Sequence, residues 1–188
     1  MMQTAARTST SNLMLCGLFS ALIAVGAFIR IPVPAVPFTL QFLFTTLAGL
    51  LLGPRLGSLS VGVYIGTGLL GIPVFTNGGG FGYILQPTFG YLLGFFVGTY
   101  ATGAIASTSR PPSLRRLLCA NLVGLLLVYL IGMLYFYIVA NYYINHPIGV
   151  LPLMLYCFLL PLPGDLAICY AGALLAKRLI LILREGVR

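Results

Sequence analysis

Residues 117–140 read LLCANLVGLLLVYLIGMLYFYIVA and contain no charged side chain. A membrane-spanning helix needs about 20 predominantly apolar residues, since the hydrocarbon core of a bilayer is about 30 Å thick. The rest of the chain has the same character, because 60% of its 188 residues are hydrophobic and only 6% are charged. Soluble domains are about one quarter charged, so this composition excludes a water-soluble globular domain and indicates an all-α integral membrane protein.

Glycine, proline and charged residues divide the apolar sequence into six runs within a single membrane domain, residues 1–188. The predicted transmembrane helices cover residues 13–31, 38–52, 56–70, 87–105, 117–140 and 151–176, with an external loop at 71–86. The second and third runs are short for straight crossings. A chain with five crossings, in which residues 38–52 are partly re-entrant, is therefore the alternative.

The positive charges fall on alternate connections between these runs. With six crossings, Arg30 is the only cation on one side of the membrane. The other side holds Arg7, Arg55, Arg110, Arg115, Arg116, Lys177, Arg178, Arg184 and Arg188. Because cytoplasmic loops carry an excess of Lys and Arg, both termini are expected in the cytoplasm. Short basic clusters of this kind are typical of membrane interfaces and do not indicate a groove for nucleic acid.

Asp165 is the only carboxylate inside an apolar run, in the segment PLPGD at residues 161–165. It precedes Lys177 by 12 residues, which places it about 18 Å from the cytoplasmic face at a helical rise of about 1.5 Å per residue. A carboxylate at that depth costs roughly 2.5–3.5 kcal/mol and is a candidate functional residue. Pro161 and Pro163 lack an N–H, so upstream carbonyls lose their helical hydrogen-bond donors. Irregular backbone of this kind is tolerated in a membrane where it lines a cavity. The alternative is a carboxylate that neighbouring backbone donors satisfy.

Two segments on the external side have unusual chemistry. Residues 31–41, IPVPAVPFTLQ, form a proline-rich turn that leads to Gln41. Residues 71–83, GIPVFTNGGGFGY, combine glycines, which let a ligand approach the backbone closely, with aromatic rings that supply apolar walls. An ordinary mobile connection is the other interpretation of this second segment. Arg30 is predicted either to reach lipid headgroups or to attract an anionic ligand.

An enzymatic role is disfavoured by the titratable residues. His146, the only histidine, has no acidic neighbour in sequence, and Asp165 and Glu185 are too far apart to act as an acid–base pair. The four cysteines show no metal-ligand spacing, and the chain has no nucleotide-binding motif. We therefore expect no cofactor and no metal, and any ATP hydrolysis would belong to separate subunits.

Three segments together resemble a known family. IPVPAVPFTLQ (31–41), GIPVFTNGGGFGYILQPTFGYLLGF (71–95) and PLPGD (161–165) are similar, in the same order, to signature segments of BioY proteins. BioY is the biotin-specific substrate-binding (S) component of energy-coupling-factor (ECF) transporters. The resemblance implies a multi-pass protein of the bacterial cell membrane with six helices and a pocket near the external face. It also implies three kinds of partner: biotin, a transmembrane coupling subunit and two cytoplasmic ATPases.

The resemblance also implies site residues. Asp165 would accept hydrogen bonds from the ureido N–H groups of biotin, and Gln41 would line the pocket or gate it. The other end of the ligand would be held by Asn77 with the backbone of Gly78 and Gly79. Phe75 and Tyr83 would pack against the rings and tail of biotin.

The chain departs from the family pattern at three positions. Ile168 stands where many relatives carry a lysine, which removes a polar contact three residues after Asp165. Gln86 and Phe89 stand where glycine is common, and both are expected to reshape the pocket floor. Arg30 is conjectured to compensate for the missing lysine by pairing with the biotin carboxylate.

The first helix offers a surface for a partner subunit. Gly17 and Ala21, or in another register Ser20 and Ala24, place small residues four apart, which lets helices approach closely in lipid. The resemblance favours docking to the coupling subunit, and packing within this chain is the alternative. For the whole protein, the rival functions are an S component for another vitamin, such as lipoate or riboflavin, and a non-transporting membrane scaffold.

Overall fold

The computed structural model describes residues 10–31, 36–108, 112–144 and 147–185. The described elements are α1 (Thr10–Phe28), β1 (Arg30–Ile31), β2 (Phe38–Thr39), α2 (Gln41–Leu69), the 3-10 helix η1 (Phe81–Leu85), α3 (Phe89–Ala106), α4 (Leu114–Ile138), the π-helix η2 (Val139–Tyr143), α5 (Val150–Met154), the π-helix η3 (Leu155–Leu159) and α6 (Leu162–Glu185). Pro32, Pro34, His146, Arg7, Arg110 and Arg188 lie outside the described residues, as do the side chains of Arg184 and Glu185.

Five described helices are long and apolar enough to cross a membrane. They are Thr10–Phe28, Gln41–Leu69, Phe89–Ala106, Leu114–Tyr143 and Val150–Ile182. This differs from the six predicted runs because residues 38–52 and 56–70 both fall largely within α2. The last span is longer than predicted, since α6 continues through the basic segment after Ala176.

The helix α2 is broken at Gly53, whose φ of 82° and ψ of −177° are not helical. Glycine adopts a positive φ without steric cost, and Pro54, just after it, is well suited to the first turn of a helix. Beyond the break, a Cβ built on Gly57 would lie 2.9 Å from the carbonyl oxygen of Ala48. Gln41, at the beginning of α2, hydrogen-bonds the Tyr64 hydroxyl over a distance of 2.8 Å. The two halves of α2 therefore run side by side in opposite directions.

Small residues allow α3 to approach the helices on both of its sides. A Cβ on Gly98 would lie 2.8 Å from the carbonyl oxygen of Gly124 in α4. On the other side, a Cβ on Gly49 of α2 would lie 2.7 Å from the carbonyl oxygen of Thr99. Such close backbone approach is the usual basis of helix packing in lipid, where burial of apolar surface gives little driving force.

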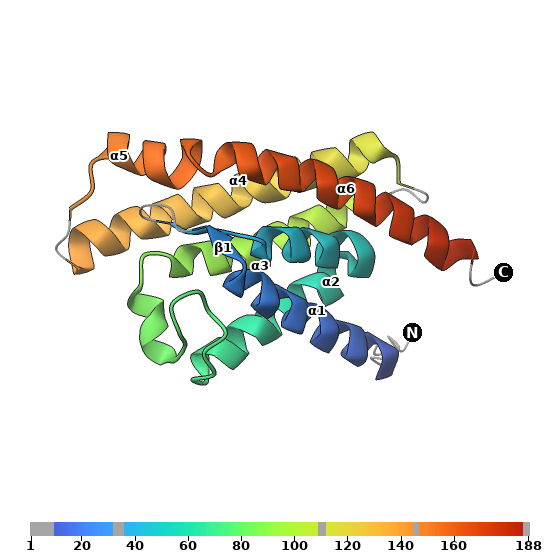
Figure 1. Cartoon of the computed structure of the whole chain (residues 1–188), viewed down its shortest axis with the longest axis horizontal. Helices are drawn as coiled ribbons and strands as arrows, with labels where there is room; N and C mark the ends of the chain where they lie inside the picture. Colours follow the sequence, from blue (N-terminus) through green and yellow to red (C-terminus); the bar gives the residue numbers. More distant parts are fainter. Residues whose placement is uncertain (1–9, 32–35, 109–111, 145–146, 186–188) are drawn as a thin grey trace, which may run out of the picture.

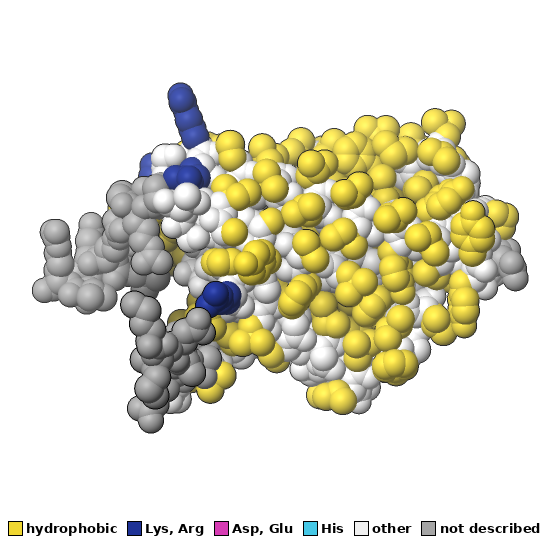
Figure 2. Space-filling model, turned by 180° about the vertical axis from the view of Figure 1, so that it is seen from behind, with side chains coloured by type: hydrophobic (Ala, Val, Ile, Leu, Met, Phe, Trp, Pro, Cys, Tyr) yellow, Lys and Arg dark blue, Asp and Glu magenta, His cyan; other side chains and the backbone are white. Residues whose placement is uncertain are grey.

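Hydrophobic side chains extend along the length of the helices on the face that Figure 2 shows. On α4, for example, Leu126, Leu130 and Leu134 recur every four residues and are each at least 60% exposed. Lys and Arg side chains gather at one end of the face that Figure 2 shows. An apolar belt with charges at its end is the surface of a multi-pass membrane protein.

The two ends of the helical bundle differ in their connections (Figure 1). The start of α1 and the end of α6 lie at one end, and the end of α4 and the start of α5 lie at the other. Near that second end, residues 70–88 fold back against the bundle, and β1 pairs antiparallel with β2 with Arg30 opposite Thr39. Residues of β2 and of the 70–88 segment border a cavity.

Candidate ligand-binding site

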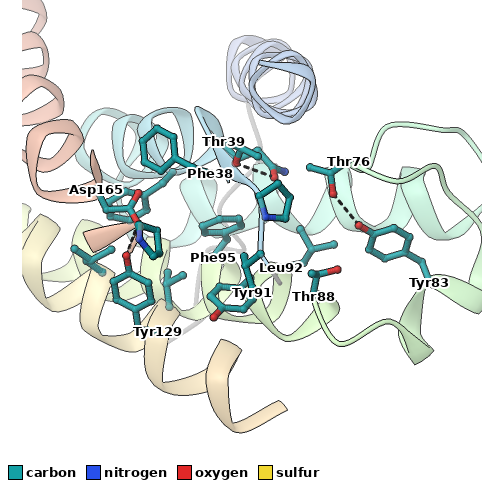
Figure 3. Close-up of a pocket in the computed structure, with 17 residues that line it drawn as sticks. Phe38, Thr39, Thr76, Tyr83, Thr88, Tyr91, Leu92, Phe95, Tyr129 and Asp165 are labelled. Carbon is teal, nitrogen blue, oxygen red and sulfur yellow. Dashed lines mark hydrogen bonds between the residues drawn. The ribbon is translucent and has the colours of Figure 1, made fainter. Parts of the chain in front are cut away.

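A cavity lies between the strand pair, α2, α3, α4 and the beginning of α6 (Figure 3). It has about 630 Å³ of space between atoms, including open solvent at its mouth. The lining is mostly apolar with a few polar groups. It consists of Val36, Pro37, Phe38, Thr39, Gln41, Phe42, Thr76, Tyr83, Thr88, Tyr91, Leu92, Phe95, Leu125, Val128, Tyr129, Pro161 and Asp165.

Asp165 carries the only described carboxylate of this lining, and its side chain is 9% exposed. Tyr129 of α4 donates a hydrogen bond from its hydroxyl to Oδ2 of Asp165 (Figure 3). Asp165 also lies in the first turn of α6, where the helix dipole favours a negative charge. The other carboxylate oxygen, Oδ1, accepts no hydrogen bond from the part of the chain that the structure describes. One acceptor is thus left for a ligand.

The prolines before Asp165 shape the wall of the cavity. In a regular helix the carbonyl of Cys157 would accept a hydrogen bond from residue 161, but Pro161 has no N–H. Tyr91 of α3 supplies the missing donor, with its hydroxyl 3.1 Å from the Cys157 carbonyl oxygen. The π-helix η3 directly precedes this break. The interpretation of the PLPGD segment as irregular backbone beside a cavity is confirmed by this arrangement.

Aromatic and aliphatic side chains form the middle of the cavity. Phe95 and Leu92 project from α3, and Leu125 and Val128 face them from α4. Phe38 covers Gly164, where a Cβ would lie 2.6 Å from its ring. A ligand between these side chains would be largely removed from water.

Gln41 lines the cavity and also anchors residues 71–86, which the sequence predicts to be an external loop. Its amide nitrogen donates to the Tyr64 hydroxyl at 2.8 Å, and Tyr64 donates to the carbonyl of Val74 at 3.2 Å. Thr39 bonds the Gln41 side-chain oxygen at 3.3 Å. This chain of polar contacts ties the beginning of α2 to residues 71–86.

Several residues predicted to contact ligand do not line the cavity. Phe75 is 1% exposed and packs between the rings of Tyr64 and Tyr83, so it supports the external loop from within. Asn77 is exposed, and its Oδ1 accepts a hydrogen bond from Arg30 at 3.1 Å. Arg30 also donates to the carbonyl of Thr76.

The glycines and Gln86 of the external loop are likewise placed outside the cavity lining. Gly78 has a φ of 114°, and a Cβ on Gly79 would lie 2.3 Å from the carbonyl oxygen of Ile72. Both positions therefore require glycine for the fold of the loop itself. Gln86 is half-buried next to η1. Of the residues that the sequence predicts as substrate contacts, the cavity brings together Asp165, Gln41 and Tyr83.

Two departures from the family pattern are buried in the apolar core. Ile168, one turn after Asp165, is buried and does not line the cavity. Phe89 packs against Tyr135, with their ring centroids 6.0 Å apart. Neither side chain provides a polar contact near Asp165.

The two small-residue registers of α1 have different environments. Gly17 and Ala21 are exposed, and a Cβ on Gly17 would have no neighbour within 4 Å. In contrast, Ser20 is buried and bonds the carbonyl of Ser60 at 2.6 Å. Ala24 packs against the core. The Ser20 register is therefore used within this chain, and the Gly17 register is available to a partner.

Tyr129, Tyr91, Phe95 and Thr88 line the cavity and are not predicted from the sequence. Tyr129 is one of several tyrosines in the run 117–140, and no feature of that run separates it from tyrosines at the membrane interface. Thr88 follows Pro87 within residues 71–95, a segment that resembles the BioY family, and this position is the sequence feature that could have indicated it.

Comparisons with known proteins identify the family and the fold of this chain. Residues 1–185 match the BioY family. The chain is 44% identical to a probable biotin transporter BioY of Lysinibacillus sphaericus, over 95% of this chain and 91% of that protein. It is 36% identical to the biotin transporter BioY of Thermotoga maritima, over 89% of this chain and 95% of that protein.

A solved structure is also similar. It is a crystal structure at 2.1 Å of the S-component for biotin from an ECF-type ABC transporter, and it superimposes with a TM-score of 0.77. The match covers 95% of this chain and 94% of that chain, at 26% sequence identity. The matched family, the curated relatives and the shared fold together show that this chain belongs to the BioY family.

Proposed function

We propose that this protein captures biotin from outside the cell and acts as the substrate-specific subunit of an ATP-driven ECF-type transporter. The observation that carries this proposal is the Asp165 carboxylate, which lines an otherwise apolar cavity with one oxygen unpaired. The relatives named as biotin transporters and the S-component for biotin support it. The role is capture and transport, and no chemical step is assigned to this chain.

The chemistry of biotin matches the cavity. Its ureido ring presents two N–H donors, which suit the free oxygen of Asp165, and its fused rings and aliphatic tail suit the wall formed by Phe95, Leu92 and Phe38. A ligand without such donors would leave a buried carboxylate unpaired, which is costly. Lipoate has a dithiolane ring without N–H groups, so it should bind much more weakly than biotin.

We further propose that the two halves of α2 cross the membrane separately, so that the chain makes six crossings with both termini in the cytoplasm. The antiparallel contacts across the break at Gly53 support this topology. The membrane would be the bacterial cytoplasmic membrane. Among the described cations, Arg55, Arg115 and Lys177 would then lie on the cytoplasmic side and Arg30 on the external side.

The external loop, residues 71–86, would close over the bound ligand. Thr76 and Tyr83 already line the cavity from this loop and hydrogen-bond each other at 3.0 Å. Asn77, Gly78 and Gly79 lie on the outer side of the same loop, and Arg30 holds it to β1. Opening of this segment would give biotin a route from outside.

Uptake against a gradient would require partners, which we propose to be a transmembrane coupling subunit and two cytoplasmic ATPases. The similarity to an S-component of an ECF-type ABC transporter supports this assembly. The exposed Gly17 and Ala21 face of α1 is the proposed docking surface, because small exposed residues let a second helix approach closely.

The substitution Asp165→Asn tests the proposal. Asn keeps an oxygen that can accept the hydrogen bond from Tyr129 and removes the charge that biotin N–H groups would meet. Hydrogen bonds to a charged group contribute about 1.5–3 kcal/mol, so the dissociation constant for biotin should rise by at least about tenfold. Isothermal titration of the purified chain with biotin measures this change.

A second measurement separates the ligand-binding role of Asp165 from a purely structural role. Because Asn removes a buried charge, the ligand-free Asp165→Asn protein should unfold at the same or a higher temperature. Lower stability with unchanged biotin affinity would contradict the proposal. Thr99→Val is the control, since the Thr99 hydroxyl bonds the Thr45 carbonyl at 3.3 Å away from the cavity. Displacement of biotin by lipoate or riboflavin would favour another vitamin, and no saturable binding would favour a scaffold.

A further inference from the structure

The hydroxyl groups around the cavity differ in whether they have a hydrogen-bond partner, and the proposed function does not explain this difference. Most are already paired: Tyr129 bonds Asp165, Tyr91 bonds the Cys157 carbonyl, and Thr76 bonds Tyr83. The Thr39 hydroxyl bonds the side chain of Gln41. Thr88 is the exception, because its Oγ1 is buried and has no hydrogen-bond partner among the described residues.

The position of Thr88 in the chain makes this exception notable. It is the residue that precedes the first turn of α3, where a threonine side chain usually accepts a hydrogen bond from a backbone N–H of the helix. Thr88 makes no such bond and lines the cavity instead. A buried polar atom without a partner is destabilising, so a partner supplied by a bound ligand would account for the hydroxyl at this place.

Thr88 and Asp165 lie toward opposite ends of the cavity (Figure 3). The side chains of Phe95 and Leu92 lie between them. The two unsatisfied groups therefore favour an elongated ligand that donates hydrogen bonds at one end, is apolar in the middle and accepts a hydrogen bond at the other end.

We propose that Thr88 is the second polar anchor of the site and donates a hydrogen bond from its hydroxyl to the tail carboxylate of the ligand. This inference rests on the proposed function, since biotin carries its carboxylate at the end of the chain that leaves the fused rings. The sequence-based conjecture assigned this carboxylate to Arg30. However, the Arg30 guanidinium is bonded to Thr76 and Asn77 on the outer side of the loop and does not line the cavity.

Thr88→Val tests the anchor because valine has nearly the same shape and no hydroxyl. The binding of biotin and of biotin methyl ester to the purified chain is measured for the wild type and the variant. Thr88→Val should weaken biotin binding by about tenfold. The methyl ester keeps a carbonyl acceptor but carries no charge, so its binding should weaken less. The preference for biotin over its ester should fall accordingly.

The unfolding temperature of the ligand-free protein distinguishes this role from a structural one. Thr88→Val removes an unpaired polar atom, so the variant should be at least as stable as the wild type. The control Thr99→Val, on the same helix, removes a paired hydroxyl and should lower stability while it leaves the preference for biotin over the ester intact.

Two different results would contradict the Thr88 anchor and the proposed function, respectively. If the wild type binds biotin but Thr88→Val leaves the biotin-to-ester preference unchanged, the anchor is refuted and the proposed function stands. If the wild type shows no saturable biotin binding, the proposed function itself fails, and the anchor fails with it.

Discussion

A carboxylate deep in the helical bundle is tolerated here through one specific neighbour. Tyr129 of α4 donates to Oδ2 of Asp165 and pairs one of its two oxygens before any ligand arrives. Residues 129 and 165 come from different helices, so their pairing depends on how α4 and α6 pack. The hydrogen bond from Tyr129 thus offsets part of the desolvation penalty of the buried charge, and hydrogen bonds from a bound ligand are expected to offset the rest.

Tyr129→Phe should therefore lower the stability of the ligand-free protein. The loss of a hydrogen bond to a buried charged group is expected to cost about 1–3 kcal/mol in the free energy of unfolding. Thermal unfolding in detergent measures the change. Tyr170→Phe is the control, because Tyr170 is more than half exposed on the outside of α6 and should be neutral. Equal stability of the two variants would show that Tyr129 does not satisfy Asp165.

Among the elements, the external loop depends on contacts that reach it from the rest of the fold. Phe75 inserts against Gly68 of α2, where a side chain would collide with the ring. Arg30 bonds the loop from β1, and Gln41 and Tyr64 bond it from α2. The loop is held at several points, and only the Arg30 contact lies on its exposed side.

Arg30→Gln should loosen the outer side of this loop without altering the part of the cavity wall that the helices form. An exposed contact of this kind contributes at most about 1 kcal/mol, so the dissociation rate of biotin should rise by roughly twofold to fivefold. Stopped-flow exchange of bound biotin measures that rate. The preference for biotin over its methyl ester should not change. A loss of that preference would instead show that Arg30 pairs with the ligand carboxylate.

At the scale of the whole molecule, the break at Gly53 decides how many times the chain crosses the membrane. The antiparallel halves of α2 are supported by the contact of Gly57 with Ala48 and by the bond between Gln41 and Tyr64. If both halves cross, Arg55 and Ile72 lie on opposite sides. If residues 38–52 instead enter the membrane from outside and return to the same side, Arg55 lies outside and Ile72 lies inside.

Cysteine labelling in whole cells tests this topology. Arg55→Cys and Ile72→Cys are made separately in a Cys119→Ser background, because Cys119 is exposed and the other three cysteines are buried. A membrane-impermeant maleimide should modify Ile72→Cys in intact cells and Arg55→Cys only after permeabilisation. The reverse pattern would establish five crossings with a re-entrant segment.

The sequence by itself determined the membrane class and the approximate position of most helices, and it singled out Asp165 as a candidate site residue. These features depend on local quantities: the transfer free energy of each apolar run and the cost of a single charge within it. The prolines next to Asp165 likewise predict an irregular backbone without reference to any other helix.

Only the tertiary structure decided which side chains meet Asp165 and line the cavity. In a soluble protein an apolar face marks the core, but in a membrane the lipid-facing side of a helix is as apolar as its buried side. Leu126 faces outward and Leu125 lines the cavity, although they are adjacent and chemically identical. Tyr129 was therefore indistinguishable from the other tyrosines of its run, and only the packing of α3, α4 and α6 placed it and Thr88 around one cavity.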